Sequence, residues 1–136
     1  MSVVVIGEYV GAKKVRLVHE PSGSVLTTEA PKDNGGEGSS FSPTDLLGAA
    51  LGSCVLTTIA IVAERLGVNV AGMHMRVEKH MSSDPRRVGD LPLVVHLPKM
   101  LDDTIRQKLE RAGLACPVHK SLHPDIKMPV SFVYDL

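Results

Sequence analysis

Short apolar runs open the chain and are separated by residues typical of turns. The runs cover residues 3–10, 15–19 and 24–30, and the segments GAKK and EPSG lie between them. Valine-rich runs bounded by Gly, Pro and Ser predict three consecutive strands in a meander. Residues 31–42, PKDNGGEGSSFS, then predict a long Gly- and Ser-rich loop, and loops of this length often carry function.

The next segment predicts one long helix over residues 43–66. Ser42 stands at the N-cap, Pro43 at the first helical position and Asp45 at the third, which is the arrangement of a capping box. Gly67 follows the last apolar position and is expected to end the helix.

The centre of this helix is strongly apolar. Residues 46–63 contain no charged side chain. This uncharged segment is close to the shortest length that can span a bilayer. Ser53, Thr57 and Thr58 interrupt the apolar run, and neither end carries Trp or Tyr. We therefore expect a wholly buried central helix in a soluble protein, without a membrane partner. A small domain buries such a helix poorly on its own, so the segment also favours an intimate homodimer.

The second half of the chain returns to strand patterns. Alternating positions over residues 70–77 predict a half-buried strand with Met73, Met75 and Val77 facing inward. Residues 82–90 predict a hairpin loop, and residues 91–97 its returning strand.

The remaining segments predict a second helix, a short turn and a last strand. Asp102 or Asp103 is expected to cap the helix, which Gly113 would end. The inward positions of this helix are Ile105, Leu109 and Ala112. A short helical turn starts at Pro117 with Cys116 at its cap, and residues 128–136 predict the closing strand. This order of elements indicates an α+β fold with mostly antiparallel sheets around the central helix.

Composition narrows the class of protein. The length of 136 residues predicts a single domain, 1–136. Fifteen basic residues balance fifteen acidic ones, without a block of like charges, so no nucleic-acid partner is expected. The N-terminus lacks the basic region and cleavage site of a signal peptide, which predicts a cytoplasmic protein.

The chain has only two cysteines, Cys54 and Cys116, 62 positions apart. Each has an interpretation without chemistry. Cys54 could be an inert core thiol, as free cysteines often are, and Cys116 could simply cap the helical turn that begins at Pro117. Cys116 also lies where backbone N–H groups favour a thiolate, whereas Cys54 at mid-helix needs a cation from elsewhere. A third interpretation is a zinc site formed by Cys116, His119 and His123, with Cys54 as a further ligand.

Two motifs together resemble the OsmC/Ohr family. The helix opening FSPTDLLGAALGSCVLTTIA and the later ACPVHKSL match the family's paired cysteine motifs, and the order of elements matches over nearly the whole chain. The resemblance implies small intertwined dimers that reduce organic hydroperoxides with cysteine thiols. It implies a peroxidatic role for Cys54, whose thiolate becomes a sulfenic acid, and a resolving role for Cys116. It also implies a dithiol or lipoyl-type reductant, and no metal, haem, flavin or other cofactor.

The resemblance is incomplete around the activating residues. In peroxidase members a glutamate follows the helix-opening proline and acts with an arginine, but this chain has Thr44 there and Asp45 one residue later. We expect Asp45 to replace the glutamate, unless it serves only as a cap. Arg16 is the candidate cation, with Lys32 as the next choice. Leu51, Val55 and Thr58 are expected to line an apolar entrance.

The departures leave two other hypotheses open. One is a redox sensor or ligand-binding protein that keeps both thiols without the activating pair. The other is the Cys/His metal-binding protein.

Overall fold

The computed structural model describes residues 1–136, which divide into two compact units. The first unit is Met1–Leu46 and the second is Leu47–Leu136. The single domain expected over 1–136 stays a prediction.

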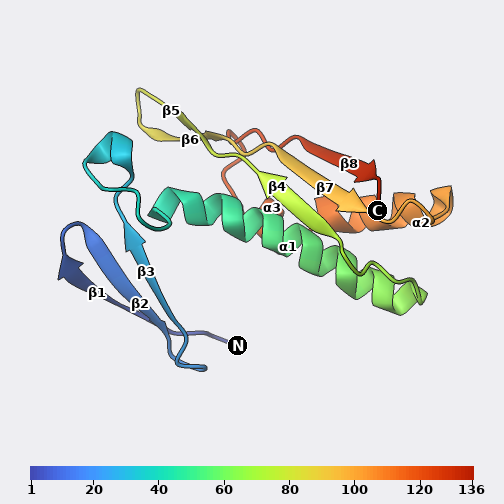
Figure 1. Cartoon of the computed structure of the whole chain (residues 1–136), viewed down its shortest axis with the longest axis horizontal. Helices are drawn as coiled ribbons and strands as arrows, with labels where there is room; N and C mark the ends of the chain where they lie inside the picture. The colour runs from blue at the N-terminus through green and yellow to red at the C-terminus, as the bar shows by residue number, and fades with distance from the viewer. The chain divides into compact units, whose positions relative to one another are not determined.

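The first unit is built on a three-stranded antiparallel sheet, which confirms the predicted meander (Figure 1). Its strands are β1 (Val5–Gly11), β2 (Lys14–His19) and β3 (Val25–Glu29), in the order β1-β2-β3. Many of its large apolar side chains are exposed. These are Met1, Val3, Val4, Val5, Ile6, Tyr9, Val10, Val25, Leu26 and Phe41.

A buried carboxylate fastens the Gly- and Ser-rich loop to β3. Glu29 is 1% exposed and accepts hydrogen bonds from the backbone N–H and the hydroxyl of Ser39, at 2.9 and 2.8 Å. Lys14 Nζ lies 3.5 Å from the same carboxylate. These partners, with the Ser39 hydrogen bonds first, lower the pKa of Glu29 from 4.5 to about 2. The loop itself contains the short 3₁₀ helix η1 (Lys32–Asn34).

Helix α1 (Pro43–Leu66) has both predicted ends. Ser42 Oγ accepts a hydrogen bond from the Asp45 N–H at 3.1 Å, and Asp45 Oδ2 accepts one from the Ser42 N–H at 2.8 Å. These reciprocal bonds form the capping box. At the other end Gly67 has φ +69°, and the next N–H bonds back to the Ala63 carbonyl at 3.0 Å, as in a Schellman motif.

Within the second unit, α1 buries one stripe of side chains. The buried positions are Gly48, Leu51, Gly52, Val55, Ile59 and Ala63. Ser53, Thr57 and Ile61 are exposed. The prediction of a wholly buried helix is therefore wrong for the single chain, in which only this stripe is buried. By length and composition alone α1 could cross a membrane, but the core helix of a soluble protein passes the same test.

The main sheet of the second unit has the order β4-β7-β8 (Figure 1). Its strands are β4 (His74–Val77), β7 (Leu93–Leu97) and β8 (Val130–Tyr134). β4 and β7 are antiparallel, as expected, whereas β7 and β8 are parallel. The predicted inward alternation is confirmed, because Met73, Met75 and Val77 pack against the core.

Two boundaries in this region differ from the predicted ones. The strand expected from residue 70 begins only at His74, because the chain turns at Gly72, where φ is +86°. The loop expected over residues 82–90 is partly a hairpin. Its strands are β5 (His80–Ser82) and β6 (Arg87–Asp90).

Helix α2 (Asp103–Leu114) starts as predicted but does not end as predicted. Asp102 is its N-cap and accepts a hydrogen bond from the Ile105 N–H at 2.9 Å. The prediction that Gly113 ends the helix is wrong, because Gly113 is buried inside the last turn. A Cβ at Gly113 would lie 3.1 Å from side-chain atoms of both Val55 and Ile59, so glycine allows α2 to approach α1 closely.

Polar contacts also hold α2 against β8. The Tyr134 hydroxyl donates a hydrogen bond to Glu110 at 2.6 Å. The Arg106 guanidinium lies 4.0 Å from the centre of the Tyr134 ring. Burial, followed by the Glu110 hydrogen bond, raises the pKa of Tyr134. This phenol therefore stays protonated and remains a donor at neutral pH.

Candidate functional site

Cys54 lies at mid-length on α1, beside its buried stripe. Its side chain is half-buried and packs against the apolar core of the second unit. Its own carbonyl accepts a hydrogen bond from the Thr58 hydroxyl at 2.8 Å. Since α1 has no charged residue between positions 46 and 63, any cation that stabilises a Cys54 thiolate must come from another element.

Cys116 lies at the N-cap of α3 (Pro117–Ser121), as the sequence predicts. Its backbone is extended, with φ −63° and ψ 148°, as the following proline favours. The Sγ atom accepts a hydrogen bond from the His119 N–H at 3.3 Å. Cys116 has no exposed surface, which distinguishes it from Cys54.

The structure brings the two cysteines together. Burial is the largest cause that raises the pKa of Cys116, and Cys54 raises it further through a side-chain hydrogen bond and through its charge. The N–H groups of His119 and Val118 act in the opposite direction. Both cysteines are free. The pair therefore consists of a buried thiol that favours its protonated form and a half-buried thiol beside it.

Gly113 positions this pair in a way that the sequence did not reveal. Its close approach to α1 occurs at Val55 and Ile59, directly after Cys54. The Cys116 N–H then bonds to the Gly113 carbonyl at 3.3 Å. The position of Cys116, three residues after Gly113, therefore depends on the close contact between α1 and α2. No local signal marked this glycine as anything other than a helix end.

The other predicted site residues belong to the first unit. Arg16 is exposed on β2, where its cross-strand partners are Glu8 and Thr27. Asp45 takes part in the capping box, and the Thr44 hydroxyl lies 3.2 Å from Ser42 Oγ. The cysteines belong to the second unit, so activation of Cys54 by Arg16 and Asp45 stays a prediction.

Lys32, the second candidate cation, is also in the first unit, within η1. Its side-chain carbons pass close to Gly38, where an added Cβ would lie 2.9 Å from them. Lys32 therefore packs along its own loop.

The predicted apolar entrance needs correction. Leu51 and Val55 have no exposed surface and form part of the core, so the prediction that they line an entrance is wrong. They lie on the buried stripe because they are spaced four residues apart. Thr58 is half-buried.

The cysteines and histidines do not form a cluster of metal ligands. No three His, Cys, Asp or Glu side chains are grouped so that they could hold a metal ion. His119 follows Cys116 within α3, whereas His123 lies beyond it, where its Nδ1 accepts a hydrogen bond from the Asp125 N–H at 3.0 Å. The geometry therefore gives no support to the zinc site of Cys116, His119 and His123.

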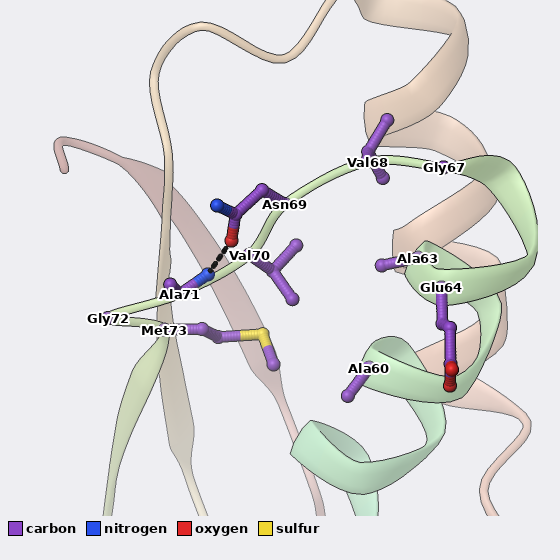
Figure 2. Close-up of a pocket in the computed structure, with 10 residues that line it drawn as sticks. All are labelled: Ala60, Ala63, Glu64, Gly67, Val68, Asn69, Val70, Ala71, Gly72 and Met73. Atoms are coloured by element: carbon purple, nitrogen blue, oxygen red, sulfur yellow. Dashed lines mark hydrogen bonds between the residues drawn. The ribbon is translucent and has the colours of Figure 1, made fainter.

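A hollow at the end of α1 lies apart from the thiols (Figure 2). It has a volume of about 620 Å³ and is lined by residues from Ala60 to Met73. Its polar lining side chains are Glu64 and Asn69, and Asn69 turns back over its own loop in the figure, where it accepts a hydrogen bond from the Ala71 N–H at 2.8 Å. Neither cysteine lines it, so we place the candidate site at the thiol pair.

Comparison with known proteins agrees with this fold and these motifs. The family model for the OsmC-like protein matches residues 36–131, which include both cysteines. The chain therefore belongs to the OsmC-like protein family, which includes organic hydroperoxide resistance proteins.

Solved structures give the same result. A protein of Psychrobacter arcticus 273-4, for which a role in osmotic stress and detoxification has been suggested, is 39% identical with a TM-score of 0.90, covering 94% of this chain and 93% of that one. The organic hydroperoxide resistance protein OsmC of Legionella pneumophila has a TM-score of 0.77 at 18% identity, covering 98% and 97%. The organic hydroperoxide resistance protein OhrB of Bacillus subtilis has a TM-score of 0.69 at 17% identity, covering 97% and 98%. The last two show the shared fold.

Proposed function

We propose that this protein is a thiol-dependent peroxidase that reduces organic hydroperoxides with Cys54 and Cys116. One observation carries the proposal: the only two cysteines of the chain, 62 positions apart, interact directly inside the second unit. A pair of inert core thiols would not need to meet. The organic hydroperoxide resistance proteins with the same fold support the choice of substrate.

The two thiols differ in a way that suits an ordered reaction. The half-buried Cys54 is the sulfur that a hydroperoxide can reach. Its thiolate attacks the O–O bond, which releases an alcohol and leaves a sulfenic acid on Cys54. Cys116, whose pKa is raised chiefly by burial, then gives up its proton and attacks that sulfur as the thiolate. Water leaves, and a Cys54–Cys116 disulfide forms. A dithiol, of lipoyl type by the family resemblance, returns both cysteines to thiols.

Activation of Cys54 is assigned to the first unit. α1 provides no charged group near Cys54, so the cation that stabilises the thiolate has to come from another element. Arg16 would be that cation. Asp45 would orient Arg16 in addition to its role in the capping box. This assignment follows the family pattern, with Asp45 in place of the missing glutamate.

We further propose that the protein acts as a homodimer in the cytoplasm. The exposed valines and aromatic residues of the first unit and the exposed side of α1 support a second copy, since both leave apolar surface uncovered. Light scattering after gel filtration would give the mass in solution.

Titration of the reduced protein with cumene hydroperoxide tests the peroxidase directly. We expect consumption of one equivalent of peroxide and a loss of about 2 Da in the denatured mass, because two hydrogens leave when the disulfide forms. An unchanged mass with equimolar peroxide would contradict the proposal and favour a redox sensor or ligand-binding protein. Elemental analysis of the same sample addresses the metal-binding hypothesis.

A further inference from the structure

We propose that the thiol reductant attacks the disulfide at Cys54, so that Cys54 accepts both the hydroperoxide and the reductant while Cys116 only leaves and returns. This inference rests on the proposed two-cysteine function and adds the sulfur at which that function is reset. It follows from the unequal access to the two cysteines.

Access separates the two sulfurs clearly. Cys116 has no exposed surface in the single chain, whereas Cys54 is partly exposed. A second copy of the chain, or any other partner, can only cover more surface. The fold of the single chain therefore shields Cys116 from an external thiol. Thiol–disulfide exchange requires the incoming thiolate to reach a sulfur directly.

The depression beside α3 does not provide a second route to Cys116. A depression of about 540 Å³ lies beside α3 and is lined by residues that include Arg111, Ala115 and Lys120. Ala115 is the immediate neighbour of Cys116 in sequence, yet Cys116 itself does not line the depression. The Sγ atom instead points to the His119 N–H and to Cys54.

The exchange at Cys54 balances in two steps. A first thiol bonds through its sulfur to Cys54 Sγ, the Cys54–Cys116 bond breaks, and Cys116 takes the proton. A second thiol then attacks the reductant's sulfur, which frees Cys54 and leaves the reductant as a disulfide. Two thiols are oxidised, and the two protein sulfurs are reduced.

The chemistry of Cys116 has opposing effects on the two steps. A raised pKa makes Cys116 a slower leaving group. By itself this would favour attack at Cys116, with Cys54 as the leaving group. Burial is the larger effect, because a sulfur that no thiol can reach does not exchange. Once released, Cys116 stays protonated and re-attacks slowly, since the thiolate is the nucleophile. The mixed disulfide on Cys54 should therefore persist long enough to be trapped.

The test is to map the mixed disulfide on the intact protein. The oxidised protein is treated with excess 2-mercaptoethanol, quenched in acid, alkylated with N-ethylmaleimide under denaturing conditions and digested. We expect mercaptoethanol on Cys54 and maleimide on Cys116, with at least about tenfold less of the reverse pattern. Mercaptoethanol on Cys116, equal labelling of both, or no adduct on either cysteine would overturn the proposal.

Single-cysteine variants give an independent measurement. In native buffer Cys116→Ser should react with Ellman's reagent at least about tenfold faster than Cys54→Ser, and denaturation should remove the difference. Equal native rates in folded variants would overturn the inference. If either variant fails to fold, the mapping in the wild-type protein decides.

The oxidant separates this inference from the proposed function. The disulfide is prepared in one sample with cumene hydroperoxide and in another with diamide, which oxidises thiol pairs without peroxide chemistry. Failure of the peroxide alone contradicts the peroxidase, and the diamide sample still locates the exchanging sulfur.

Discussion

The two units of this chain bury opposite kinds of residue. All the buried hydrophobic residues lie in the second unit, and they include Cys116. The buried polar residues, Thr28, Glu29 and Ser42, all lie in the first unit. The second unit is thus stabilised by its own apolar core, which also encloses the candidate chemistry. The first unit is held by hydrogen bonds and leaves its valines exposed.

The largest expected effect tests whether the chemistry belongs to the second unit. Cys54→Ser should lower peroxide turnover by about a thousandfold or more, because it removes the nucleophile. Cys116→Ser should consume a single equivalent and stop at a sulfenic acid or a more oxidised form. A peroxide assay and intact mass distinguish the two results. Equal loss in both variants at the first turnover would contradict the assigned order.

The next largest effect compares the apolar residues of the two units. Leu51→Ala should lower the free energy of unfolding by about 2–5 kcal/mol, because it leaves a cavity in the core. Ile6→Ala, at a position that is 53% exposed, should cost about 0.5 kcal/mol or less in a monomer. Urea denaturation measures both. A large loss for Ile6→Ala that depends on protein concentration would indicate that a second copy covers β1.

A third variant asks whether the first unit contributes to the chemistry. Arg16→Ala should slow the reaction with hydroperoxide by roughly a hundredfold, because it removes an electrostatic stabiliser. Lys32→Ala is the matched control. An unchanged rate of peroxide consumption for Arg16→Ala would show that Arg16 is the wrong cation.

Glu29 provides a pH test of the first unit. Its folded pKa of about 2 lies below the ordinary 4.5, so the unfolded chain binds the proton more readily. The stabilisation is fully present above about pH 4.5 and is lost as the pH falls toward 2. Glu29→Gln should therefore flatten the fall in stability over this window, whereas Glu8→Gln on exposed β1 should not. Identical acid profiles for both variants would contradict this role of the buried carboxylate.

The smallest expected effect concerns the contact that places the thiols. At Gly113 an added methyl overpacks Val55 and Ile59 at a cost of about 1–3 kcal/mol, partly offset by about 1 kcal/mol of better helix propensity. Gly113→Ala should therefore change stability little but slow disulfide formation, because Cys116 moves with α2. Leu114→Ala, on the exposed side of α2, is the control. Unchanged oxidation kinetics would show that the close approach is not needed.

Much of the fold could be predicted because its signals are local. A capping box and a C-terminal glycine fix the ends of α1 through bonds that span only a few residues. The valine-rich runs of the first unit and the alternating positions of β4 indicate strands for the same reason. The features that were missed are of two kinds: one depends on a distant partner strand, and the other is a local hairpin whose strands are only three and four residues long. β8 pairs parallel to β7, and the hairpin β5–β6 forms where only a loop was expected.

The candidate site divides in the same way. The sequence by itself determined the family motifs, the mid-helix position of Cys54 and the cap position of Cys116, since each depends on neighbours along the chain. Only the tertiary structure decided that these cysteines meet and that Cys116 is a buried thiol, whose pKa that burial raises. It also gave Gly113 its role, because a close approach between two helices depends on how distant surfaces pack and leaves no signal in the residues beside it.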